Sequence, residues 1–71
     1  MLKTKEIETA MLNELNSHGF EDSPENRLDF LLGLRDGWRE DTSKSLEKSL
    51  YMLALELMIS RLMLKVAIRQ M

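Results

Sequence analysis

The feature that most constrains this chain is its apolar carboxyl-terminal part. Between Leu50 and Ile59 the only polar side chain is Glu56, and neither Gly nor Pro occurs after Gly37. This pattern predicts one long helix over about residues 42–70. A helix that is apolar nearly all round has to be buried on all sides. The rest of the chain therefore has to be judged by how much of this helix it covers.

The long helix carries more than one apolar stripe. Apolar residues that lie at nearly the same angle, at 100° per residue, form the principal stripe. Most of this stripe, together with the small residues Ser60 and Ala67, also follows the alternating spacing of three and four residues that is typical of coiled coils. Two further stripes lie well round the same helix. The principal stripe consists of Leu46, Leu50, Leu53, Leu57, Leu64, Ile68 and Met71.

Two shorter helices are predicted before it. Apolar residues recur every fourth position over about residues 4–18, and Gly19 is placed to end that helix, with Phe20 folding back on its last turn. Ser23 and Pro24 suit the start of a second helix over about residues 24–36. We expect Gly37 to end it, and the alternative is that it continues to about residue 40.

The short length of the chain, taken with this pattern, predicts that it assembles with a second copy. Seventy-one residues form one domain at most, residues 1–71, and a domain this small is usually supported by disulfides, a metal or a partner chain. The chain has no Cys and one His. Two short helices offer too little apolar surface to cover the third. The fold class expected is therefore all-α, with three helices and the third central, in a homodimeric helical bundle.

The second copy is expected to pack on the long helix, with the shorter helices outside. An antiparallel arrangement is favoured, although the sequence leaves a parallel one open. Leu57→Glu is expected to unfold the protein, because an unpaired buried charge is costly. The expected dimer interface consists of Leu50, Leu53, Leu57, Leu64 and Met71.

Catalytic and metal-binding constellations are not found. His18 is the single histidine, and its place at a helix end favours an interaction with the terminal carbonyls over acid–base work. Without Cys or a His cluster, no metal site is expected, and the sequence shows no cofactor motif. We therefore expect a protein that is not an enzyme and has no cofactor.

Charge limits the partners. Net charge is −2, and residues 1–41 hold ten acidic against five basic side chains, whereas general nucleic-acid binding relies on a basic face. Glu56, Arg61 and Lys65 would be costly in lipid, so no membrane span is expected. The first residues become polar too early for a signal peptide. A cytoplasmic protein is the expectation.

A degenerate helix-turn-helix over residues 28–46 is the first alternative. Gly33 and Gly37 followed by a Ser/Thr-rich helix start have some of the features of that motif. However, Glu40 and Asp41 place negative charge where a recognition helix would meet phosphates. The resulting alternative function is a dimeric DNA-binding regulator.

Interaction with another protein is favoured by elimination. Trp38 beside a glycine and two arginines has the composition of an interface anchor, and a basic row on the last helix could contact an acidic partner. We expect a small interaction module, of the kind that bacteria and phages use as regulators, inhibitors or adaptors. A structural subunit of a hetero-oligomer is the further alternative. The candidate partner-binding residues are Trp38, Arg35, Arg39, Arg61, Lys65 and Arg69.

Overall fold

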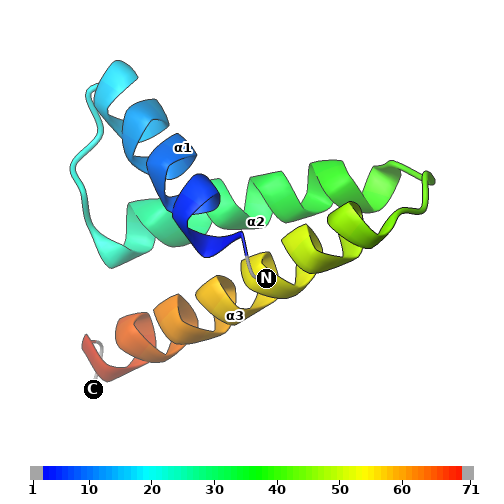
Figure 1. The fold of residues 1–71 in the computed structure, drawn as a ribbon. Coiled ribbons are helices and arrows are strands. Elements are labelled where there is room, and N and C mark those ends of the chain that lie inside the picture. Colours follow the sequence, from blue (N-terminus) through cyan, green and yellow to red (C-terminus); the bar gives the residue numbers. More distant parts are fainter. Residues whose placement is uncertain (1–2, 70–71) are drawn as a thin grey trace.

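The computed structural model describes residues 3–69, which form three helices and no strands. They are α1 (Thr4–Ser17), α2 (Pro24–Glu40) and α3 (Leu46–Arg69). As Figure 1 shows, α2 and α3 run side by side in opposite directions, and α1 crosses over this hairpin. The all-helical class and the three-helix count are confirmed.

The end of α1 forms as its sequence predicts. The Phe20 N–H donates to the Leu15 carbonyl (2.9 Å), and the Gly19 N–H donates to that of Asn16 (3.2 Å). This pair of hydrogen bonds is the Schellman motif, which requires a left-handed residue at the glycine position. Gly19 has a φ of +71°, which glycine adopts without a steric penalty.

The start of α2 is also the predicted one. The Ser23 hydroxyl accepts a hydrogen bond from the Asn26 N–H (3.2 Å), and Pro24 occupies the first turn, where a missing N–H costs nothing. Arg27, in the first turns of α2, donates from Nη2 to Oδ2 of Asp22, which precedes the helix, at 2.7 Å. The hydrogen bond from Arg27 lowers the pKa of the Asp22 carboxyl.

The predicted end of α2 at residue 36 is wrong. The helix continues through Gly37 to Glu40, as the alternative had it. Trp38 therefore lies within the helix and packs against Tyr51 of α3, with ring centroids 4.9 Å apart. Packing of this kind between helices outweighs the low helix propensity of a single glycine.

The predicted start of α3 near residue 42 is also wrong, because the helix begins at Leu46. The Ser45 hydroxyl caps it by accepting from the Lys48 N–H (3.1 Å). Upstream, the Asp41 carboxylate accepts from both the backbone N–H and the hydroxyl of Ser43, each at 3.0 Å. These bonds hold the connection in a turn and lower the pKa of the Asp41 carboxyl.

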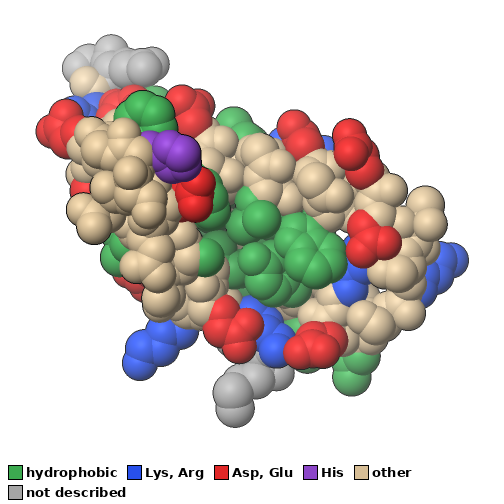
Figure 2. Space-filling view, turned by 90° about the horizontal axis from the view of Figure 1, so that it is seen from above, with side chains coloured by type: hydrophobic (Ala, Val, Ile, Leu, Met, Phe, Trp, Pro, Cys, Tyr) green, Lys and Arg blue, Asp and Glu red, His purple; other side chains and the backbone are tan. Residues whose placement is uncertain are grey.

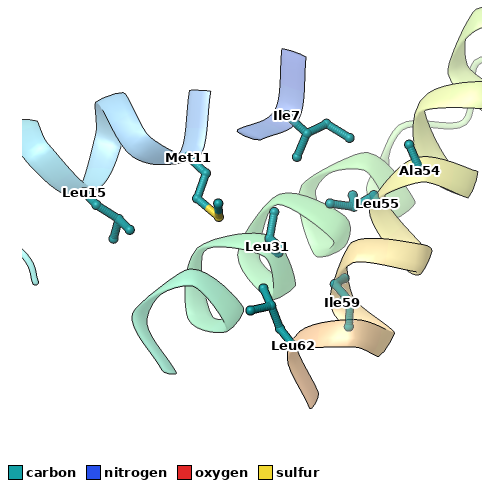
Figure 3. Packing of buried hydrophobic residues seen from close by; sticks show 8 residues of the cluster. All are labelled: Ile7, Met11, Leu15, Leu31, Ala54, Leu55, Ile59 and Leu62. Carbon is teal, nitrogen blue, oxygen red and sulfur yellow. The ribbon is translucent and has the colours of Figure 1, made fainter. Parts of the chain in front are cut away.

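The core lies where the three helices meet. Figure 3 shows side chains of α1 directed toward α2 and α3, with Leu31 of α2 between them. Leu31 and Leu55 are completely buried. No polar side chain among the described residues is buried with them. The buried set consists of Ile7, Met11, Leu15, Leu31, Ala54, Leu55, Ile59 and Leu62.

Candidate protein-interaction surface

Helix α3 has two apolar faces, and the rest of the chain covers only one. The buried residues of α3 lie on the side that meets α1 and α2. On the opposite side, the five large aliphatic side chains Leu46, Leu53, Leu57, Leu64 and Ile68 are 41% to 77% exposed. We call this the outer face of α3, and it consists of Leu46, Leu50, Leu53, Leu57, Ser60, Leu64, Ala67 and Ile68.

The outer face carries no charged side chain. Its polar residues are Ser60 and, at its edge in line with Ala67, Ser49, and from Leu46 to Ile68 it extends about 33 Å at 1.5 Å per residue. Soluble monomers rarely expose a continuous apolar surface of this size unless it is used for an interaction. The leucines that the sequence places on one stripe share an exposed face of α3, and the use of that face as a dimer interface stays a prediction.

Four of the five residues expected at the dimer interface belong to the outer face. Leu53, Leu57 and Leu64 are exposed, and Leu50 is half-buried. Met71 lies outside the described residues. The single chain leaves this side of α3 uncovered, as the sequence predicts, and burial of α3 on all sides by a second copy stays a prediction. A charge at Leu57 would consequently point away from the core of its own chain.

Three of the arginines predicted to bind a partner lie close to acidic residues of their own chain, and their role toward a partner stays a prediction. Arg35 Nη1 and Arg39 Nη2 of α2 lie 3.7 Å and 3.6 Å from Glu56 Oε1 of α3. At the other end of the hairpin, Arg69 Nη1 donates to Glu25 Oε1 at 3.0 Å. These contacts join α2 to α3, so they serve the fold of the single chain.

Trp38, the proposed aromatic anchor, also serves the fold. Its ring is half-buried against Tyr51 and packs on the core cluster. Near Trp38, Lys3 links the start of α1 to the start of α3, because its ammonium donates to Glu47 Oε1 at 2.9 Å. This bond raises the pKa of Lys3 and lowers that of Glu47.

Arg61 and Lys65 remain as exposed cations. They line a groove of about 270 Å³ between α1 and α3. Arg27 adds a third cation, and Glu8 is the one acidic residue of the lining. The apolar side chains of the groove are Met11, Met58 and Leu62. The cations and apolar side chains of this groove suit an acidic peptide segment. Trp38 and Arg35 lie at the other end of the hairpin and do not line the groove.

The sequence did not predict a second apolar surface, located between the end of α1 and the start of α2. Leu15, Phe20 and Phe30 line a hollow of about 560 Å³ there. Phe20 does not join the core, because it is 59% exposed and its ring stacks on that of His18. Figure 2 shows hydrophobic side chains gathered in the middle of the face seen from above, with acidic side chains around them.

The rim of this hollow is polar, and two of its four polar residues are acidic. Glu14 comes from α1 and Asp29 from α2, and Glu14 Oε1 lies 2.6 Å from His18 Nε2. His18 therefore contacts a side chain of its own helix as well as the Phe20 ring. One signal was available in the sequence: Phe30 is offset by 100° from the buried Leu31, which directs it to the edge of the core.

The described residues 3–69 offer little else for chemistry. They contain no group of three potential metal ligands. Within the same residues no helix is long and apolar enough to cross a lipid bilayer. The helix-turn-helix alternative loses its turn, because α2 continues through Gly37 and then forms an antiparallel hairpin with α3.

Comparison with protein-family models, with curated proteins and with solved structures found no significant match for this chain. The functional argument therefore depends on the surfaces described above.

Proposed function

We propose that this chain is a small protein-interaction module that acts as a homodimer. The observation that carries the proposal is the outer face of α3, an apolar surface without a charged side chain that α1 and α2 leave uncovered. Covering it with a second copy removes apolar side chains from water, which is the main favourable term in association. Such support is what a chain of this size without Cys needs.

Dimerisation through α3 leaves the opposite side of each subunit free for a target. The hollow lined by Leu15, Phe20 and Phe30 lies between the end of α1 and the start of α2, and no residue of α3 lines it. An exposed aromatic ring beside an apolar hollow is typical of an interface anchor. The acidic rim favours a target segment with basic side chains around an apolar residue.

The mechanism we propose is occlusion of a surface on a larger protein, as a regulator, inhibitor or adaptor of the bacterial or phage type would act. A pre-formed dimer presents two identical hollows, so it can engage two copies of a target segment. The absence of Cys fits a reducing compartment, and we therefore place the protein in the cytoplasm.

Capture experiments with matched variants test the target surface. The immobilised chain is exposed to extract of its source cell beside Phe20→Glu and, as a control elsewhere on α1, Ala10→Glu, since both positions are exposed. The proposal predicts a protein held by the native chain and Ala10→Glu but released by Phe20→Glu. If the same proteins bind all three chains, or none does, the hollow is not the target site.

The cationic groove between α1 and α3 needs its own variant. Arg61→Glu combined with Lys65→Glu removes the exposed cations of that groove while leaving the Phe20 hollow unchanged. We expect this double variant to keep the target. Loss of the target with this variant alone would instead assign the interaction to an acidic segment lying in the groove.

A structural subunit of a hetero-oligomer would show a different behaviour in isolation. Without its partners, its uncovered apolar surface would cause aggregation, whereas the homodimer we propose has one defined mass. The third option, DNA binding, finds no support in the observed surfaces, because residues 1–41 are strongly acidic and α2 has no turn at Gly37.

A further inference from the structure

We infer that the second copy lies antiparallel along the outer face of α3, with Leu57 opposite Ser60 and Leu50 opposite Ala67 of the second copy. The inference rests on the proposed dimer and decides the direction and register of the partner helix. It comes from the order of large and small side chains along the outer face.

The outer face changes in size along the helix. Its first half consists of four leucines, from Leu46 to Leu57, whereas its second half places the small Ser60 and Ala67 around Leu64. Two such faces fit best when the large half of one meets the small half of the other. Packed interfaces reach the density of protein interiors, so a fit of this kind decides between arrangements.

One register pairs six of the eight outer-face positions at once. When Leu57 faces Ser60 of the second copy, Leu50 faces Ala67 and Leu53 faces Leu64, because each pair is equally far from a centre between residues 58 and 59. Helix α3 covers Leu46–Arg69, so its own midpoint lies within about one residue of that centre. The register that matches the sizes is therefore also the one in which both helices overlap along nearly their whole length.

The parallel arrangement gives poorer packing. In register, it places Ser60 opposite Ser60 and Ala67 opposite Ala67, and each of these layers lacks the side-chain volume of a leucine. Voids of that size forfeit contacts on every side that lines them. A second copy in the parallel direction would also align the two helix dipoles, whereas the antiparallel direction opposes them.

One charge pair favours the parallel arrangement. Glu56 and Arg61 flank the outer face at the positions that would meet between parallel helices. However, Glu56 is already close to Arg35 and Arg39 of its own chain, at 3.7 Å and 3.6 Å. Exposed ion pairs contribute little, so the packing of the leucines outweighs this one.

Disulfide trapping tests the direction, and the native chain provides a clean background because it has no Cys. Two variants, Leu53→Cys and Leu64→Cys, are oxidised separately and also after unfolding and refolding together. A disulfide needs Cα atoms within about 7 Å. In the antiparallel dimer, position 53 of one chain lies level with position 64 of the other. Two cysteines at the same position, one in each chain, are therefore about 16 Å apart along the helix axis, since eleven residues separate positions 53 and 64.

The antiparallel arrangement predicts cross-linked dimers from the mixture and few from either variant alone. A second pair, Leu50→Cys with Ala67→Cys, gives the same pattern and guards against one cysteine disturbing the fold. The mass of each reduced variant is measured first. Efficient cross-linking of each variant alone would show the parallel arrangement and overturn the inference.

Two other outcomes separate the inference from the proposed function. A native chain with the mass of a dimer, but no cross-linking in any arm, would place the second copy on another face or register and overturn the inference alone. A native chain with the mass of a monomer would contradict the proposed dimer, and the inference with it.

Discussion

Leu53 and Leu55 lie two positions apart on α3 and face in opposite directions: the Leu55 side chain is completely buried, whereas that of Leu53 is 52% exposed. Two residues turn an α-helix by 200°, so the helix has an apolar surface on each side. Its own chain covers the Leu55 side. The Leu53 side is the basis of the proposed dimer.

Leu57→Glu is expected to separate the dimer while leaving the core of each chain in place. Leu57 lies on the outer face, so the new carboxylate would be desolvated only against a second copy. This outcome replaces the unfolding expected from the sequence. Light scattering should give half the mass of the native protein, with helix content by circular dichroism largely kept.

Phe20→Glu is the matched control for that substitution, because Phe20 is similarly exposed but lies away from α3. It should leave the mass unchanged. If Leu57→Glu also kept the mass of the native protein, the outer face would not be the dimer interface.

Leu31→Ala should be among the most damaging core substitutions. Leu31 is completely buried between the three helices, and removing such a side chain leaves a cavity that costs about 2–5 kcal/mol. Urea unfolding at one fixed protein concentration measures the loss. Phe20→Ala, at an exposed position, should change the free energy of unfolding by less than about 0.5 kcal/mol. Equal losses for both would contradict the core described above.

Replacing glycine by alanine should change the free energy of unfolding in opposite directions at Gly37 and Gly19. Gly37 lies inside α2 with ordinary backbone angles, and a Cβ added there meets nothing within 4 Å. Gly37→Ala should therefore raise the free energy of unfolding by about 0.5–1 kcal/mol. Gly19 has a φ of +71°, so Gly19→Ala should lower it by roughly 1–2 kcal/mol. Thermal unfolding of both variants gives the comparison, and a loss at Gly37 would mean that residue 37 is not in a regular helix.

Stability should fall in acid. The pKa values of Asp22 and Asp41 are lowered from 3.8, and that of Glu47 from 4.5, by hydrogen bonds from Arg27, Ser43 and Lys3 respectively. A carboxyl whose pKa is lower in the folded state stabilises the fold above its ordinary pKa, and this contribution is lost as the pH falls through the lowered value.

Urea midpoints at pH 7 and pH 3 test this expectation. The native chain should have the lower midpoint at pH 3. A variant with Asp22→Asn and Glu47→Gln should show a smaller difference, since two of the three carboxyls are gone. An unchanged difference in that variant would mean that other groups set the acid dependence.

Local sequence predicts the parts of this fold that depend on local contacts. The Gly19 turn and the Ser23 cap each form from hydrogen bonds within a few residues, and both are confirmed. The end of α2 depends on Trp38 meeting Tyr51 of another helix, which no local pattern records. The predicted start of α3 was too early because Thr42 and Ser43 are also residues that can cap a helix, whereas in the structure Ser45 is the cap.

The same division applies to the interaction surfaces. The outer face of α3 follows from the periodicity of one helix, so the sequence alone located it. The hollow beside Phe20 depends on the angle at which α1 crosses α2, and it emerges only from the structure. The intrachain neighbours of Arg35 and Arg39 also emerge only from the structure, because the hairpin brings Glu56 next to them.

The mass of the native chain in solution tests the central claim most directly. Sedimentation equilibrium over a range of micromolar concentrations should give twice the chain mass of 8.3 kDa for a folded, helical protein. A stable, folded species of 8.3 kDa at all of these concentrations would contradict the account, because the outer face of α3 would then be exposed without a second copy.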